Sequence, residues 1–193
     1  MAERARQAAP QFGMDEMAQT KLRAILVALA AAGGMTLVGS APAAAAGDPI
    51  LSRLVGEWIG GGMAKSAPNA NPEHVFCKIT NSLSADGKSL QQRGRCALPA
   101  QSTSIKGTIT ASGGGKYAGS MQSLQTDGAA TLTGTGSGDT IDFVAEYVDR
   151  LSKKPGTSKV SLIVTGEGYR LVTNVTGRDK KPFLASDISF RHP

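Results

Sequence analysis

From residue 47 to the end of the chain, apolar and polar side chains alternate in short runs separated by turn residues. Cys77 and Ile79, for example, alternate with Lys78 and Thr80. A period of two is typical of β-strands that bury one face, and turn signals about every dozen residues are typical of antiparallel sheets. The runs begin near Trp58 and continue over 75–83, 90–98, 105–111, 117–121, 130–132, 141–147, 160–164, 169–173 and 184–190. We therefore predict about ten strands, preceded by one short helical turn over 49–54.

The short, glycine-rich turns between these runs indicate how the strands pair. Turn residues such as Asp86-Gly87, and the segment 112–115, allow consecutive strands to form hairpins. Closing the resulting sheet into a barrel removes the two exposed edges that invite aggregation. We predict an all-β fold, a single antiparallel up-and-down β-barrel of about 8–10 strands. A two-sheet sandwich is the alternative.

Composition supports one small globular domain. The chain has 193 residues, of which 24 are glycine and 5% are aromatic, and this glycine content disfavours a helical bundle. The formal net charge is +6, but the cations are spread along the chain. A spread of this kind is typical of an ordinary basic surface, so we expect no nucleic-acid partner.

The N-terminal segment has the layout of a secretory signal peptide. Lys21 and Arg23 precede an apolar segment over 24–39, and the alanine-rich stretch after it offers a cleavage site ending at Ala46. A membrane anchor is the alternative, but the apolar segment is shorter than the roughly 20 residues that a spanning helix needs. No cysteine stands at the cleavage point, which disfavours a lipoprotein.

We therefore predict a signal peptide over 1–46 and a barrel domain over 47–193, in a periplasmic or secreted protein. Because residues 1–16 are long and unpatterned for a leader, Met14 or Met17 is the alternative start.

Cys77 and Cys96 are the two cysteines of the chain, and an exported protein is expected to join such a pair in a disulfide. A hairpin that turns at Asp86-Gly87 places them directly opposite each other. The same register aligns the inward residues of both strands, so we predict a structural bridge. A redox-active pair is the alternative, and it lacks the C-x-x-C spacing.

This register also creates a basic patch on the other face of the hairpin. Lys78 lies opposite Arg95, with Arg93 two residues along. Like charges that face each other are unfavourable unless an acid or an anionic partner lies nearby. We favour a solvated barrel wall; the alternative is contact with an anionic envelope surface, through lipid head groups or polysaccharide.

The single tryptophan stands at the first predicted strand, in the string LVGEW over 54–58, and the last strand ends with Arg191. This combination resembles the calycin superfamily, which comprises lipocalin-like, fatty-acid-binding-protein-like and avidin-like barrels. These barrels share a G-x-W on the first strand and an Arg from the last strand. The resemblance implies that Gly56, Trp58 and Arg191 close one end of the barrel, with the guanidinium over the indole. A plain core aromatic and a frayed terminal Arg are the alternative.

Lipocalin-like barrels carry small apolar molecules, so the resemblance implies a ligand site inside the barrel. The inward residues that would line it are Ile105, Ile109, Tyr117, Met121, Leu132, Phe143 and Tyr147. Inward glycines such as Gly107 and Gly134 would leave room, although a filled core is the alternative. We predict an exported, non-catalytic barrel that binds a small apolar or amphipathic ligand. An avidin-like site is disfavoured, because that family uses several tryptophans.

Two other functions remain open. The G-x-W start and the predicted disulfide also resemble the bacterial metalloprotease inhibitor family, which implies a protease partner and inhibition through residues 47–53. The third possibility is a structural, envelope-associated protein without a ligand.

Candidate chemistry is sparse. With His74 and His192 as the two histidines, we can assemble no catalytic triad and no metal site. We predict no enzyme activity, no catalytic residue, no metal and no cofactor. An axial haem ligand at His74 is the alternative left open.

Overall fold

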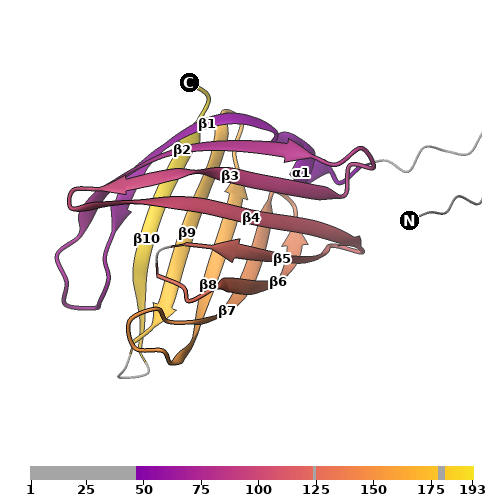
Figure 1. Ribbon diagram of the computed structural model, residues 1–193. Helices are drawn as coiled ribbons and strands as arrows, with labels where there is room; N and C mark the ends of the chain where they lie inside the picture. The colour runs from indigo at the N-terminus through magenta and orange to yellow at the C-terminus, as the bar shows by residue number, and fades with distance from the viewer. Residues whose placement is uncertain (1–46, 124, 178–180) are drawn as a thin grey trace, which may run out of the picture. The chain divides into compact units, whose positions relative to one another are not determined.

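The barrel is a computed structural model that describes residues 47–123, 125–177 and 181–193. In this part of the chain, helix α1 (Pro49–Arg53) precedes ten strands. The strands are β1 (Gly56–Ala64), β2 (Glu73–Leu83), β3 (Ser89–Leu98), β4 (Gln101–Gly113), β5 (Lys116–Gln122), β6 (Ala129–Ser137), β7 (Thr140–Val148), β8 (Pro155–Val164), β9 (Gly168–Thr176) and β10 (Pro182–Arg191). Consecutive strands pair antiparallel and β1 also pairs with β10, which closes the barrel (Figure 1). The predicted up-and-down barrel is confirmed; the predicted signal peptide over 1–46 lies outside the described residues.

Alternation along the strands builds the core, as β7 illustrates. Ile141, Phe143 and Ala145 are buried, while Asp142 and Glu146 between them are exposed. Apolar side chains from all around the barrel meet inside it in this way and form one hydrophobic core. Several strands are longer than predicted; β6, for example, extends beyond the predicted run over 130–132 and covers Ala129–Ser137.

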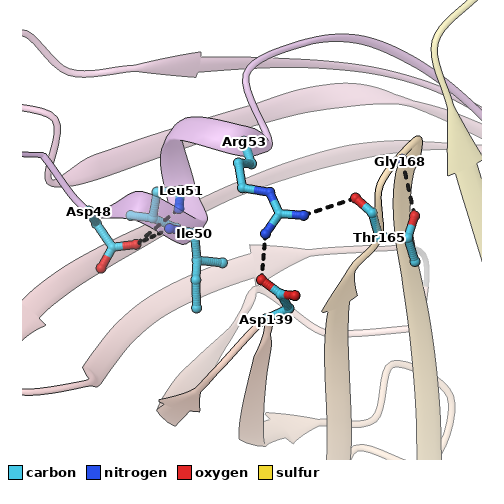
Figure 2. A network of polar contacts seen from close by, with 7 residues as sticks. All are labelled: Asp48, Ile50, Leu51, Arg53, Asp139, Thr165 and Gly168. Atoms are coloured by element: carbon cyan, nitrogen blue, oxygen red, sulfur yellow. Dashed lines mark hydrogen bonds and ion pairs between the residues drawn. The ribbon is translucent and has the colours of Figure 1, made fainter.

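Helix α1 closes one end of the barrel. Asp48 caps it, because its carboxylate accepts hydrogen bonds from the backbone N–H groups of Ile50 at 3.0 Å and Leu51 at 2.9 Å (Figure 2). The helix turns its apolar side toward the barrel, so that Ile50 and Leu51 are buried together with Leu54 after the helix. The helical turn predicted over 49–54 is therefore confirmed.

Arg53 holds α1 to two hairpin loops on the same end (Figure 2). Its guanidinium pairs with Asp139 between β6 and β7, and donates to the carbonyl oxygen of Thr165, after β8, at 3.0 Å. The Thr165 hydroxyl in turn accepts from the N–H of Gly168 at 3.1 Å. The helix is thus a lid tied to the rim by polar contacts as well as by its apolar face.

The β2–β3 hairpin has the predicted register. Cys77 lies opposite Cys96, and the two form a disulfide with a Cα–Cα distance of 4.0 Å. The turn is wider than the expected two residues, since the N–H of Ser84 donates to the carbonyl of Ser89 at 2.8 Å. Gly87 supplies the left-handed conformation that this turn needs, with φ of 69°.

Inward glycines do not leave room in the barrel, contrary to the expectation for Gly107 and Gly134. A Cβ built on Gly134 would lie 2.5 Å from the ring of Phe143, directly opposite on β7. A Cβ on Gly107 would lie 2.8 Å from the terminal methyl group of Met121 on β5. A large side chain of the neighbouring strand therefore occupies the space beside each of these glycines.

Candidate functional site

The two ends of the barrel differ in how deeply their inward side chains are buried. At the α1 end, Leu51, Leu90 and Ile141 are at most 1% exposed. In the half of the barrel remote from α1, several inward apolar side chains are partly exposed: Leu98, Ile105, Met121, Tyr147 and Val160. We call this half the open half. Solvent reaches apolar side chains there, so it is the place where the interior can receive a molecule.

A buried polar network fixes the opposite, closed end. The carbonyl oxygen of Leu54 accepts two hydrogen bonds at 2.8 Å, one from the indole N–H of Trp58 and one from the Asn81 amide. The amide of Gln92 donates to the Asn81 side-chain oxygen at 3.2 Å. Satisfied networks of this kind rigidify a core, because each buried group would cost free energy without its partner. The closed end is therefore a structural plug.

Trp58 is the centre of that plug, but its stacking partner differs from the expected one. The imidazole of His192 stacks on the indole with ring centroids 3.9 Å apart, and its Nδ1 lies 3.1 Å from the carbonyl oxygen of Glu57. Arg191 lies on the outer wall instead, opposite Ile59 of β1. Gly56 lies beneath the His192 ring, because a Cβ at this position would be 3.4 Å from that ring.

The sequence contains a signal that His192, and not Arg191, stacks on Trp58. Phe190 is inward and buried, so alternation turns Arg191 outward and leaves His192, beyond the strand end, free to fold back over the indole.

Tyr169 lies beside this plug and has a buried hydroxyl without a hydrogen-bond partner. Its ring meets Trp58 edge-on at 5.1 Å and stacks on Phe190 at 4.4 Å. Burial raises the pKa of Tyr169, and the nearby Asn81 amide lowers it by a smaller amount. The residue is therefore neutral and held in place by its rings.

The residues predicted to line a ligand site all lie at inward positions, but they divide into two groups. Ile109, Tyr117, Leu132 and Phe143 are buried, whereas Ile105, Met121 and Tyr147 are partly exposed in the open half. Two further members of the open half, Leu98 and Val160, were not among the predicted lining residues. Alternation indicates that these residues point inward, but the depth of each along the barrel depends on which end is closed.

Tyr117 has a structural contact that the sequence did not suggest. Its hydroxyl donates to the second carboxylate oxygen of Asp48 at 2.8 Å, so it links β5 to the residue that caps α1. Burial, followed by this hydrogen bond and the charge of Asp48, raises the pKa of Tyr117 to about 12. We assign Tyr117 to the closure of the barrel.

Tyr147 lies in the open half and spans two strands. A Cβ on Gly156, directly opposite on β8, would lie 2.9 Å from the Tyr147 ring, so the ring lies across that glycine. Burial raises the pKa of the Tyr147 phenol, with a smaller contribution from the charge of Asp149. The phenol is therefore a neutral hydrogen-bonding group beside apolar side chains.

The chemistry of the inward surface is nearly free of charge. Within the described strands, Glu73, at the rim where β2 begins, is the one charged residue at an inward position. Apart from Gln101 at the rim, the polar inward residues of the open half are hydroxyl-bearing: Thr103, Ser158, Thr173 and Ser186. Such a surface suits an apolar molecule with few hydroxyl or carbonyl groups.

The remaining predicted positions lie on the outside. Lys78 pairs with Arg95 and Arg93 follows on the same face, as predicted for the basic patch. His74 is exposed and points outward on β2, opposite Met63, so it offers no axial ligand to the barrel interior. Within the described residues, no group of His, Cys, Asp and Glu side chains could hold a metal ion. No helix among them is long and apolar enough to span a membrane.

Comparisons with known proteins support the fold. No family model matches the chain, and no curated protein matches its sequence. Rv2717c from M. tuberculosis has a similar structure, with a TM-score of 0.55 and 15% identity over 77% of this chain and 99% of that one. The S-type phycobiliprotein lyase CPES from Guillardia theta follows, with a TM-score of 0.47 and 14% identity over 74% of this chain and 90% of that one.

One expectation is corrected by this comparison. We predicted that the chain is not an enzyme, but a barrel described as a lyase is among the similar structures, so that prediction is withdrawn. At these identities the likeness concerns the fold alone, which is a closed antiparallel up-and-down barrel.

Proposed function

We propose that the barrel binds a small, uncharged and largely apolar molecule through its open half. The observation that carries this proposal is the gradient of burial along the barrel axis. Trp58, Leu51 and Leu54 are at most 3% exposed at the closed end, whereas inward apolar side chains remain accessible at the other. Burying accessible apolar surface under a ligand is favourable by about 25 cal/mol per Å².

The lining residues restrict the chemistry of the ligand. An ionised group would be costly inside, because the inward positions between the two rims carry no opposite charge. The hydroxyl groups of the inward residues Tyr147, Thr173 and Ser186, which are partly exposed, are available to one or two polar atoms. The ligand class is therefore a small lipid-like molecule with a neutral polar group.

An exported location is part of this proposal. The disulfide between Cys77 and Cys96 is of the kind that persists in oxidising compartments, and it supports the leader predicted over 1–46.

Protease inhibition through residues 47–53 finds no support in the structure. That mechanism needs a free N-terminal segment, but Ile50 and Leu51 are 7% and 0% exposed in the barrel core.

Binding of a neutral fluorescent probe, N-phenyl-1-naphthylamine, tests the proposal. We expect saturable binding with one probe per chain. Ile105→Trp, which fills the open half, should lower the affinity at least tenfold. The matched control is Val144→Trp, since Val144 is 46% exposed on the outer face of β7 and the same bulk there should have no effect. Trp58 is too deeply placed to report binding directly, so the fluorescence of the probe is followed.

Absence of saturable binding by the unmodified chain would refute the proposal. Equal loss in Ile105→Trp and Val144→Trp would also refute it, because the probe would then bind outside the barrel. Both variants carry the same residues 1–46, so the leader segment affects them equally.

A further inference from the structure

An apolar hollow of about 430 Å³ lies on the outer wall of the barrel, where β10, β1 and β2 run side by side (Figure 1). Its floor includes Gly61, which has no heavy atom within 4 Å of the position where a Cβ would be. Phe76 of β2, directly opposite Gly61, also lines the hollow and is 50% exposed. Phe76 points outward beside a glycine that cannot cover it, so part of its apolar surface is exposed to water. The fold itself does not require this exposed surface.

Cations border this hollow on the same wall. Arg191 and Lys78 both lie opposite Ile59, one on each side of β1. The row continues from Lys78 to Arg95 on β3, and beside it Arg93 pairs with Lys106 on β4. We call these five cations the basic wall. All five side chains are exposed, and none has a carboxylate within ion-pairing distance among the described residues.

Charge is distributed unevenly around the barrel. On the outward positions of β1–β4 the acidic residue is Glu57, against four cations of the basic wall. On the opposite side, the outward charged residues of β7 and β8 are Asp142, Glu146 and Lys159. One side of the molecule is therefore strongly basic beside an apolar hollow, and the far side is not.

We propose that the basic wall is a docking surface for an anionic phospholipid membrane, together with Phe76 beside it. Cations attract the headgroups of an anionic leaflet, and an exposed aromatic ring gains free energy at the boundary between headgroups and acyl chains. The arrangement on this wall provides both, because Arg191, Lys78 and Arg95 form one row across the strands, and Gly61 and Phe76 lie in the neighbouring row of outward residues. This site lies outside the barrel, so it is independent of the ligand site proposed above.

Co-sedimentation of the full chain with vesicles tests the proposal. Vesicles of phosphatidylcholine with 30% phosphatidylglycerol are compared with pure phosphatidylcholine, which controls for any binding through residues 1–46. We expect stronger binding to the anionic vesicles, and loss of the difference in 0.5 M NaCl. Each cation removed should lower binding roughly fivefold. The variant Lys78→Glu/Arg95→Glu should therefore lose at least about 25-fold.

Two further variants distinguish binding through this surface from attraction by the net positive charge of the protein alone. Phe76→Ser should lower binding roughly tenfold at unchanged net charge. Lys154→Glu/Lys159→Glu has the same charge change as the double variant above but lies on the far side, and it should keep binding within a few-fold of the unmodified chain. Circular dichroism and thermal melting confirm that each variant is folded before its binding is compared.

Three results would overturn the proposal: equal binding to neutral and anionic vesicles, equal losses in the two double variants, or binding to a soluble anionic polysaccharide without binding to vesicles. Loss of vesicle binding with full probe binding would support the docking surface and leave the ligand site intact. The two proposals therefore fail separately.

Discussion

A single methyl group added at Gly60 should destabilise the barrel measurably, whereas the same group at the next residue should not. A Cβ on Gly60 would lie 2.4 Å from the ring of Phe190, which is directly opposite on β10. A Cβ on Gly61 would meet nothing within 4 Å, and the backbone there is outside the left-handed region. Gly60→Ala and Gly61→Ala are thus a matched pair, one inside the barrel and one outside.

The size of the effect depends on whether the Phe190 ring can move aside. It is 5% exposed and stacks on Tyr169 with centroids 4.4 Å apart and planes 8° from parallel. Tyr169 is in turn packed edge-on against Trp58 at 5.1 Å. Because the ring is held between its neighbours, the cost should be that of overpacking a core, about 1–3 kcal/mol. A domain of this size loses about 3 °C of melting temperature per kcal/mol, which predicts a fall of about 3–9 °C.

Urea denaturation followed by the fluorescence of Trp58, with thermal melting by circular dichroism, measures both quantities. Gly61→Ala should range from no change to a gain of about 1 kcal/mol, because alanine restricts the unfolded chain. Adding Phe190→Leu to Gly60→Ala should recover part of the loss, since the smaller side chain clears the added methyl group. Equal unfolding midpoints for the two alanine variants would refute the reasoning that inward glycines are filled by opposing side chains.

Two further predictions concern the bonds that hold the barrel shut. Replacing the bridge by Cys77→Ser/Cys96→Ser should lower the free energy of unfolding by about 3 kcal/mol, measured by urea denaturation against the oxidised chain, and an unchanged midpoint would contradict a stabilising bridge. Tyr117→Phe should cost about 1–2 kcal/mol at neutral pH, because it removes the hydrogen bond to Asp48. The pKa of Tyr117 is raised from 10.0 to about 12, so its contribution is complete below pH 10 and is lost as the pH rises toward 12. Tyr117→Phe should therefore show a smaller alkaline loss of stability than the unmodified chain, and identical pH profiles would contradict this assignment.

Hairpin register was predictable because local signals agreed with one another. A turn at Asp86-Gly87, two cysteines and two runs of alternating side chains all require the same pairing, and the structure has it. The turn itself is wider than expected, yet it changes no pair, because the added residues are symmetric about its centre. Agreement between levels of structure is what makes a sequence specify one fold.

Interior volume was not predictable in the same way. The sequence marks Gly134 as an inward position without a side chain, which suggests empty space. In the structure, Phe143 of β7 folds into that position from directly opposite. The direction that a ring takes depends on its rotamer and on its neighbours across the strand, and alternation alone contains neither.

The disulfide and the basic wall are consequences of one register. Pairing Cys77 with Cys96 inside the barrel necessarily pairs Lys78 with Arg95 outside it, since successive side chains point to opposite faces. Two cations directly opposite each other oppose this pairing by up to about 1 kcal/mol. A slip by one residue would relieve them, but it would also turn the inward apolar residues of the strand to solvent. The bridge excludes that slip, so the chain can maintain a row of facing cations that strand pairing alone disfavours. An anionic surface would turn this internal repulsion into a favourable contact, and the salt dependence of vesicle binding measures how strongly.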